Sequence, residues 1–333
     1  MVTLSSRIAK ALTLPHNDPK ASILTFRKDL ARIRLQQRGC HVPEFQVCAF
    51  KQIKEMVGDL NYPVVLKPLM LSGSRGVIRA DNPEQCILAA QRIARIVAEE
   101  TRDEYERSHC LIEQFLHGEE IAIDGFVQNG KFISLALFDK PEPMNGPFFE
   151  ESFYITPSQL PPITQQAVIE EIERCCQAYG LTHGPVHAEA RITDQGVVLL
   201  EMASRTIGGQ CAQLIEFALG QKLEEVIIRL MSFESLDPGT NQRHAGVLMI
   251  PIPQGGILKR VEGMLEAQRV PNIDSIEIHI HPGYELIPLP EGSSYLGFIF
   301  ASADTHAETL QALKKAHEKL HFVTTPHWQL LPA

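Results

Sequence analysis

The order of apolar and polar positions along the chain predicts an alternation of helices and short strands. The clearest helix follows Asn82, which can cap it, because Pro83 suits the first helical position and Gln85 completes a capping box. Apolar residues then recur at the spacing of one helix face, at Ile87, Ala90, Ile93, Ala94 and Val97. Further helices are predicted over residues 22–38, 164–179, 210–219, 223–231 and 306–320, the first of which should stop at Gly39.

Alternating residues on both sides of tight turns predict two β-hairpins. In the first, Asn129-Gly130 joins strands over 120–128 and 131–138; in the second, the three residues 194–196 join strands over 185–193 and 197–202. Other strands are expected at 42–47, 63–67, 76–80, 110–115, 245–251, 275–281, 284–287 and 296–303. Residues 142–162 are rich in proline and polar side chains and predict a loop, and residues 1–21 predict an irregular lead-in.

The length of 333 residues exceeds what one ordinary core supports, so we expect two or three packed lobes of an α+β fold. The predicted division is a lead-in at 1–21, a unit at 22–110 with a glycine-rich loop, a unit at 111–236 with the second hairpin, and a C-terminal lobe at 237–333. The last boundary lies at Asp237-Pro238-Gly239, since these residues favour a turn.

Composition excludes several classes of protein. The net charge is −9 and no block rich in lysine or arginine occurs, so nucleic-acid binding has no electrostatic basis. No apolar run reaches membrane-spanning length, and the N-terminus lacks the apolar core of a signal peptide. Seven scattered cysteines without a Cys-x-x-Cys pair predict reduced, buried thiols in a cytoplasmic protein.

A lysine and a loop of small residues follow one another early in the chain. Lys67 lies near the end of the apolar run 63–68, and Ser72-Gly73-Ser74-Arg75-Gly76 follows shortly after. Backbone N–H groups of such a loop can converge on phosphate oxygens, and Lys67 can add a positive charge. A plain glycine–serine turn between two strands is the competing interpretation.

The second hairpin places two carboxylates opposite each other. With a turn at 194–196, residues whose numbers sum to 390 are paired, so Glu189 faces Glu201. Like charges at such a pair are destabilising unless a cation, a shared proton or open solvent relieves them. A bridging divalent ion fits this pair, and two glutamates on a solvated sheet face are the alternative. A hydrogen-bonded His187 is favoured over a metal-ligating one, and metal binding at His279 and His281 is disfavoured.

Five motifs in this order resemble those of ATP-grasp enzymes, in the carboxylate–amine ligase branch that includes the L-amino acid ligases. They are the helix with Lys28, Arg32, Leu35 and Gly39 before Val42-Pro43, the strand 65–68 with the loop 72–77, and the segments 112–120, 187–191 and 200–209. The similarity covers residues 22–232, and the C-terminal lobe also resembles that of the amino acid ligases. The resemblance implies two α+β subdomains that grip ATP, followed by a small α+β lobe.

The resemblance also implies roles for single residues. ATP phosphates would be contacted by Lys28, Lys67, Ser72, Gly73, Ser74 and Gly76. Adenine would be held by Glu113 and the backbone of Gln114 and Leu116, and the ribose by Glu120. Mg²⁺, or Mn²⁺ in its place, would bind Glu189 and Glu201, and the catalytic cations would be Arg75 and Arg205, the latter on the transferred phosphoryl group. A solvated helix face at Lys28 and Arg32, and an outward strand position at Glu120, are the alternatives.

Two features depart from the family pattern. Many members have an asparagine ligand two residues after the second glutamate, where this chain has Ala203, so one oxygen ligand is missing. The family also has an N-terminal α/β lobe before the grasp unit, for which residues 1–21 are too short. We therefore expect a homo-oligomer or a partner chain to cover that side of the site.

The predicted function is that of an ATP-dependent carboxylate–amine ligase. ATP would phosphorylate a small-molecule carboxylate, an amine would attack the acyl phosphate, and ADP and phosphate would leave. The acid would be an amino acid or a small peptide-like acid. A carboxylase of the biotin-carboxylase kind and a non-catalytic nucleotide-binding module are the alternatives.

Overall fold

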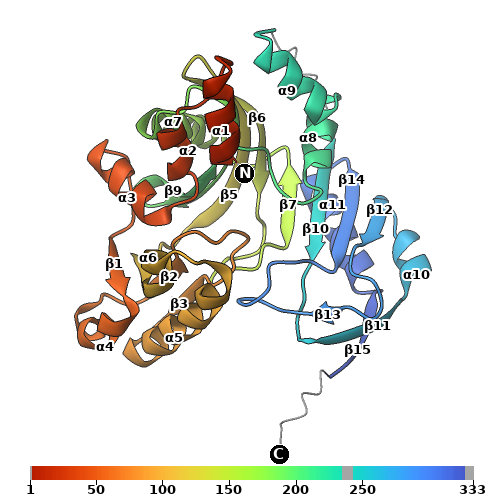
Figure 1. The fold of residues 1–333 in the computed structure, drawn as a ribbon. Helices are drawn as coiled ribbons and strands as arrows, with labels where there is room; N and C mark the ends of the chain where they lie inside the picture. The colour runs from red at the N-terminus through yellow and green to blue at the C-terminus, as the bar shows by residue number, and fades with distance from the viewer. Residues whose placement is uncertain (1, 235–242, 327–333) are drawn as a thin grey trace, which may run out of the picture.

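Three β-sheets organise residues 2–234 and 243–326, which are the residues described by this computed structural model (Figure 1). Helices cover the sheets on their outer faces, so the predicted α+β class is confirmed. The turn signal Asp237-Pro238-Gly239 lies outside the described residues. The division of the chain at 236/237 therefore stays a prediction.

The first sheet has four strands in the order β1-β4-β2-β3 and carries the predicted phosphate motif. Its strands are β1 (Phe45–Ala49), β2 (Val64–Pro68), β3 (Ile78–Ala80) and β4 (His109–Gln114), with short helices η1 (Phe50–Gln52), α4 (Ile53–Met56), η2 (Val57–Asp59) and α6 (Glu104–Ser108). The long helix α5 (Pro83–Glu100) packs on β2 and β3. As predicted, Asn82 caps α5, because its side chain accepts a hydrogen bond from the Gln85 N–H at 3.0 Å.

The second sheet has eight strands in the order β12-β14-β10-β7-β6-β5-β8-β9. Both predicted hairpins lie in it, as β5 (Glu119–Gln128) with β6 (Lys131–Asp139) and as β8 (His183–Thr193) with β9 (Gly196–Ala203). The turn between β5 and β6 has φ of 52° at Asn129 and 79° at Gly130, which is why this dipeptide signals a hairpin. Helix α7 (Pro162–Tyr179) covers one face, and α8 (Ala212–Leu219) and α9 (Leu223–Met231) cover the other.

One strand inside the predicted loop 142–162 joins the two halves of this sheet. β7 (Phe153–Thr156) pairs with β6 on one side and with β10 on the other, so the prediction of a loop is wrong at these four residues. All four are buried, and a fully buried strand of this length shows no alternation by which to recognise it. β7 thereby makes the C-terminal strands continuous with the hairpins.

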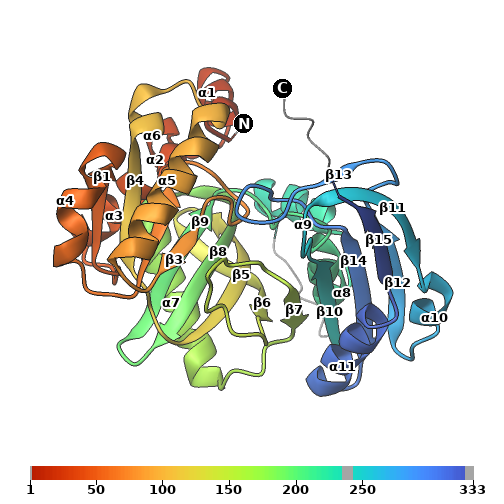
Figure 2. The ribbon, with the colours of Figure 1, turned by 90° about the horizontal axis from the view of Figure 1, so that it is seen from below.

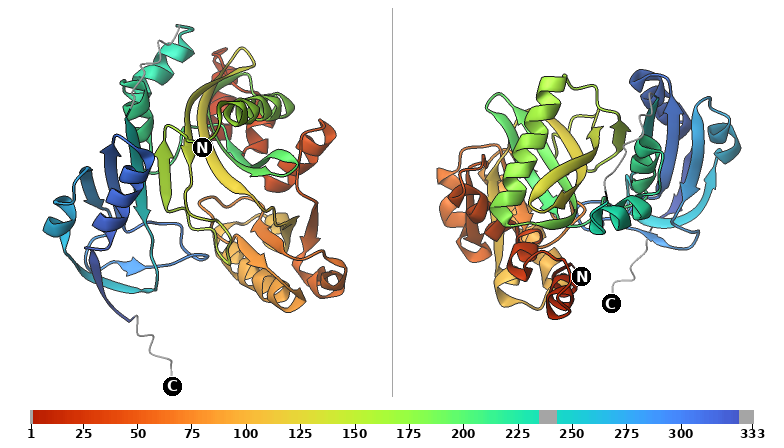
Figure 3. Two further views of the ribbon diagram at one scale, coloured as in Figure 1. Left: turned by 180° about the vertical axis from the view of Figure 1, so that it is seen from behind. Right: turned by 90° about the horizontal axis from the view of Figure 1, so that it is seen from above.

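The C-terminal strands form a wing on the opposite side of β5, β8 and β9 from the four-stranded sheet (Figures 2 and 3). The wing holds β10 (His244–Ile250), β12 (Ile273–Ile278), β14 (Gly297–Ala303) and α11 (His306–His317), near the predicted positions. The third sheet, in the order β13-β11-β15, adds β11 (Gly256–Glu262), β13 (Glu285–Leu286) and β15 (His321–Thr325). β11, β15 and α10 (Met264–Gln268) were not predicted.

The N-terminal segment differs most from the sequence prediction. Residues 1–21 are not irregular, since α1 (Val2–Ala11) and the start of α2 (Pro19–Leu24) lie within them. Helix α1 meets α2 through a 2.6 Å hydrogen bond between the Ser6 and Ser22 hydroxyls, while its apolar residues at helical spacing, Leu4 and Ile8, are exposed. The single helix predicted over 22–38 is broken between α2 and α3 (Lys28–Gln37), and α3 ends before Gly39 as predicted.

The structure bears on the predictions about membrane-spanning segments and cysteines. No helix in the described part of the chain is both long and apolar enough to cross a membrane. All seven cysteines, which lie within that part, are buried and free of disulfides, as predicted.

Candidate active site

A cavity of about 310 Å³ lies where the two larger sheets and the C-terminal wing meet. All the predicted site residues line it except Arg75 and Gly76. The lining includes Lys28, Lys67, Ser72, Gly73, Ser74, Glu113, Gln114, Leu116, Glu120, Glu189, Glu201 and Arg205. Motifs that are far apart in the sequence therefore converge on one space.

Glu189 and Glu201 are partners in the β8–β9 ladder, as predicted. The turn that was assumed to produce this pairing is wrong, because Thr193 pairs with Gly196 and only two residues lie between them. A register shift next to Glu189 offsets the shorter turn, since Ala190 pairs with Leu199 and leaves Leu200 as the extra residue of a β-bulge. The two changes cancel, and the carboxylates still face each other.

Each of these glutamates has a lysine beside it. Lys28 Nζ lies 3.2 Å from Glu201 Oε2 and donates to the Leu71 carbonyl at 2.7 Å, while Lys140 Nζ lies 3.4 Å from Glu189 Oε2. Lys28 reaches this position because it is the first residue of α3, where its N–H donates to the Leu69 carbonyl. The break between α2 and α3 thus brings a cation to the opposed carboxylates.

Glu113 is buried between two cations. Arg32 Nε and Lys67 Nζ each lie 2.5 Å from one of its carboxylate oxygens, and Glu113 and Arg32 are 2% and 3% exposed. Burial alone would raise the pKa of Glu113, but Arg32 and Lys67 outweigh it and lower the pKa to about 2. The alternative that Arg32 lies on a solvated helix face is therefore wrong.

The residues predicted to hold adenine line the cavity, and several of their polar groups have protein partners. Both Glu113 oxygens are taken by Arg32 and Lys67, so this carboxylate orients Lys67 instead of facing the cavity as a free acceptor. The Gln114 N–H donates to the Glu44 carbonyl at 2.8 Å, and the Leu116 carbonyl accepts from Arg191 at 2.5 Å. Residues 114–116 form part of the cavity wall, and a contact of the Gln114 and Leu116 backbone with adenine stays a prediction.

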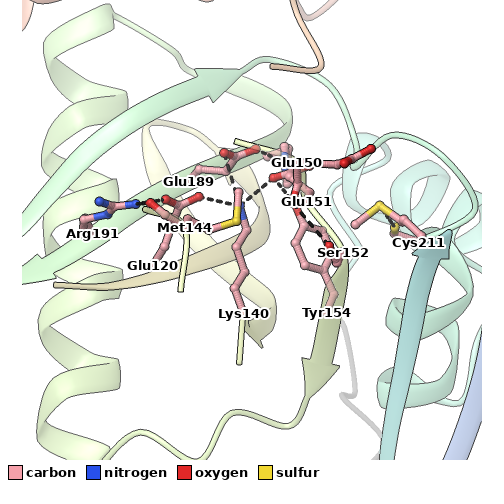
Figure 4. Close-up of polar contacts among 12 residues, drawn as sticks. Glu120, Lys140, Met144, Glu150, Glu151, Ser152, Tyr154, Glu189, Arg191 and Cys211 are labelled. Carbon is pink, nitrogen blue, oxygen red and sulfur yellow. Dashed lines mark hydrogen bonds and ion pairs between the residues drawn. The ribbon is translucent and has the colours of Figure 1, made fainter. Parts of the chain in front are cut away.

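Lys140 is the centre of a buried cluster of carboxylates (Figure 4). Its Nζ lies 2.9 Å from Glu120 Oε1 and 2.6 Å from Glu151 Oε1, in addition to its contact with Glu189. Burial would lower the pKa of Lys140, but Glu120, Glu151 and Glu189 outweigh it and raise that pKa well above its usual value. Glu120 is only 7% exposed and also binds Arg191 at 2.6 Å, so an outward strand position is wrong for it.

Sequence reasoning missed Lys140, Glu151 and Tyr154. The Tyr154 hydroxyl donates to Glu151 Oε1 at 2.7 Å, which ties β7 to the cluster. The available signal was a lysine directly after the second strand of the first hairpin, followed by the pair Glu150-Glu151. Without β7, nothing in the sequence indicated that this loop folds back onto Glu120.

Arg75 does not reach the cavity, in contrast to the catalytic role predicted for it. Its Nε donates to the Glu291 carbonyl at 2.5 Å, and its Nη1 lies 2.7 Å from Glu100. The Gly76 N–H donates to the Pro290 carbonyl at 2.9 Å, so it too has a protein partner. Ser72, Gly73 and Ser74 line the cavity, whereas Arg75 and Gly76 are bonded to the C-terminal wing.

Arg205 and His187 lie at the cavity. Arg205 is exposed at the cavity and donates to the Thr206 carbonyl at 2.7 Å. His187 is hydrogen-bonded, as favoured, with Nδ1 2.9 Å from Asp124 and Nε2 3.5 Å from Glu189. His279 and His281 do not line the cavity, and metal binding there stays a disfavoured prediction.

Comparison with known proteins agrees with this geometry. Residues 60–213 match the model of the ATP-grasp domain, and residues 248–325 match that of the L-amino acid ligase C-terminal domain 2. This chain contains an ATP-grasp domain. The first match covers the glycine-rich loop and the glutamate hairpin, and the second covers most of the C-terminal wing.

Proteins similar to this chain include ligases. The chain is 28% identical over 241 residues to dapdiamide A synthase of Enterobacter agglomerans, covering 68% of this chain and 54% of that protein. It is 23% identical over 212 residues to alanine–anticapsin ligase of Bacillus subtilis, covering 56% and 42%. The crystal structure of an L-amino acid ligase from Bacillus licheniformis superposes with a TM-score of 0.79 at 25% identity, covering 97% of this chain and 78% of that one. The chain thus spans about half the length of these two curated relatives.

The oxygen donors of this ATP-grasp site suit a divalent cation, which would share Glu120, Glu151 and Glu189 with the Lys140 ammonium. Glu120, Glu151 and Glu189 each offer a carboxylate oxygen, and these oxygens lie within 4.8 Å of one another. Glu189 also faces Glu201, so it belongs to both sets of oxygen donors. Hard oxygen donors of this kind suit Mg²⁺, which keeps several waters and takes one or two carboxylates.

Proposed function

We propose that this chain is an ATP-dependent carboxylate–amine ligase that acts through an acyl phosphate. The observation that carries the proposal is one cavity lined by the glycine-rich loop, Lys28, Lys67, the pair Glu189 and Glu201, and Arg205. The adjoining wing matches an L-amino acid ligase domain, which favours a ligase over a biotin-carboxylase-like enzyme.

In this proposal the chain positions two reactants and balances their charge. A carboxylate oxygen of the acid attacks the γ-phosphorus of ATP, and the bond to the β-phosphate oxygen breaks to release ADP. An amine nitrogen then attacks the acyl carbon and loses a proton, and the C–O bond breaks to release phosphate. Lys28, Lys67 and Arg205 stabilise the negative charge of the phosphoryl oxygens.

Glu189 and Glu201 would hold Mg²⁺, which neutralises phosphate charge when bound. Ser72, Gly73 and Ser74 would close over the phosphates and keep water from the acyl phosphate. The acid is proposed to be an amino acid or small peptide-like acid, and the amine a second amino acid. A homo-oligomer or partner chain and a cytoplasmic location stay predictions, the first of which light scattering of the purified chain tests.

The proposed function is tested by a phosphate-release screen over pairs of amino acids with ATP and Mg²⁺. We expect at least one pair to give ADP, phosphate and a ligated product in equal amounts, with the product identified by mass spectrometry. Turnover that depends on bicarbonate would favour the carboxylase alternative. ATP binding without turnover across the panel would favour the non-catalytic module.

Lys67→Ala should weaken ATP binding. A charge-assisted contact to a phosphate contributes about 1.5–3 kcal/mol, which corresponds to a rise in Kd of roughly 10- to 150-fold. Isothermal titration calorimetry with ATP and Mg²⁺ measures the change, and Lys54→Ala, at an exposed lysine of α4, is the matched control. An ATP affinity equal to that of the wild type would remove Lys67 from the phosphate site.

A further inference from the structure

Residues 288–295, here called the clasp segment, extend from the C-terminal wing to the glycine-rich loop. The segment lies between β13 and β14, and Figure 1 shows this blue stretch crossing toward α5 and β3. It accepts hydrogen bonds from the Gly76 N–H at Pro290 and from Arg75 Nε at Glu291. At the other end of the loop, a Cβ built on Gly73 would lie 3.3 Å from the Ser293 Cβ. The loop is therefore contacted along its length by one segment.

A bidentate ion pair holds the clasp segment on the four-stranded sheet side. Arg92 of α5 binds Glu291 through Nε to Oε1 at 2.5 Å and Nη2 to Oε2 at 2.7 Å. An isolated surface ion pair contributes little, but two parallel hydrogen bonds fix the geometry as well as the charge. The Arg92 guanidinium also lies over the Phe148 ring at 5.1 Å, which restricts its rotamers.

The backbone of the clasp segment is itself a closed turn. The Gly292 N–H donates to the Pro288 carbonyl at 2.9 Å, and a Cβ on Gly292 would lie 1.8 Å from the Ile287 carbonyl oxygen. Only glycine fits there, so the turn presents Glu291 at a set position. Ser293 and Tyr295 of the same segment line the cavity.

We propose that the clasp segment positions the glycine-rich loop over the nucleotide, and that Arg92 and Glu291 are positioning residues for ATP binding. The part of this proposal that concerns ATP rests on the proposed function. Arg92 and Glu291 do not line the cavity, so they act through Arg75, Gly76 and Gly73 rather than on the ligand. The C-terminal wing thereby contributes to the nucleotide site as well as to the cavity wall.

The test uses Arg92→Gln, Glu291→Gln and the reversed pair Arg92→Glu with Glu291→Arg. The rate of hydrogen exchange of the Gly76 amide, measured without nucleotide, reports how often the loop separates from the clasp segment. Calorimetry measures the Kd for ATP. Both single variants should exchange about fivefold faster and bind ATP about fivefold more weakly, and the reversed pair should restore both values to within about twofold. Arg229→Gln removes a comparable exposed pair with Glu225 on α9 and should change neither value.

An unchanged rate of Gly76 exchange in both single variants would overturn the proposal that the clasp segment holds the loop in place. Faster exchange with unchanged ATP affinity, or a reversed pair that restores neither value, would overturn the positioning role. If the wild type binds ATP but ligates no substrate pair, the proposed ligase function fails while the exchange and affinity measurements still decide this proposal.

Discussion

Replacing Glu189 or Glu201 by glutamine should lower ATP-dependent ligation by about 10²–10³-fold, the usual cost of removing one group that stabilises transition-state charge. Each substitution removes a charged oxygen donor from the proposed Mg²⁺ site and leaves the side-chain volume unchanged. Glu189 should be the more sensitive position, because it faces Glu201 and also belongs to the set with Glu120 and Glu151. Phosphate release measured across a Mg²⁺ titration gives both the rate and the metal dependence.

Folding is checked by thermal unfolding of each variant, since the loss of turnover should occur without a large fall in Tm. Glu119→Gln is the matched control, because Glu119 is an exposed carboxylate of β5 that does not line the cavity. Wild-type turnover with an unchanged Mg²⁺ dependence in both Glu189→Gln and Glu201→Gln would end the metal proposal.

Glu113→Gln should destabilise the fold by about 3–5 kcal/mol in the free energy of unfolding. The substitution leaves Arg32 and Lys67 without their shared counter-charge, and removing one partner of a buried ion pair typically costs this much. Urea unfolding at pH 7 measures the loss. Glu55→Gln, at an exposed carboxylate of α4, should cost less than about 0.5 kcal/mol.

The same carboxylate predicts a change in acid stability. The pKa of Glu113 is lowered from 4.5 to about 2 in the folded chain, so its ionised form stabilises the fold above pH 4.5 and this contribution is lost as the pH falls toward 2. The stability of Glu113→Gln should therefore fall less steeply over that range than the stability of the wild type. Equal slopes for the two proteins would show that Glu113 is not held ionised by Arg32 and Lys67.

Local signals in the sequence were sufficient for several elements of the fold. The Asn82 cap and the Asn129-Gly130 turn each act within a few residues, so tertiary context did not override them. The twelve predicted residues that line the cavity were named by the resemblance to ATP-grasp enzymes, not by such local signals.

Elements that depend on distant partners were not predictable in this way. β7 is a strand because β6 and β10 pair with it, and α3 begins where the Lys28 N–H donates to the Leu69 carbonyl. Neither partner is close in sequence. Periodicity reports only which face of an element is apolar and is silent on which backbone will lie beside it.

The sequence by itself determined the residue types at the site. The opposition of Glu189 to Glu201 was predicted from the wrong turn, and it holds because a β-bulge at Leu200 offsets the shorter turn. Only the tertiary structure decided which charge faces which. It assigned Glu113 to Arg32 and Lys67, placed Lys140 among Glu120, Glu151 and Glu189, and turned Arg75 to Glu100 and the C-terminal wing. The physical reason is that burial makes an unpaired charge costly, so each buried charge is matched to whichever opposite charge the packed elements bring within reach.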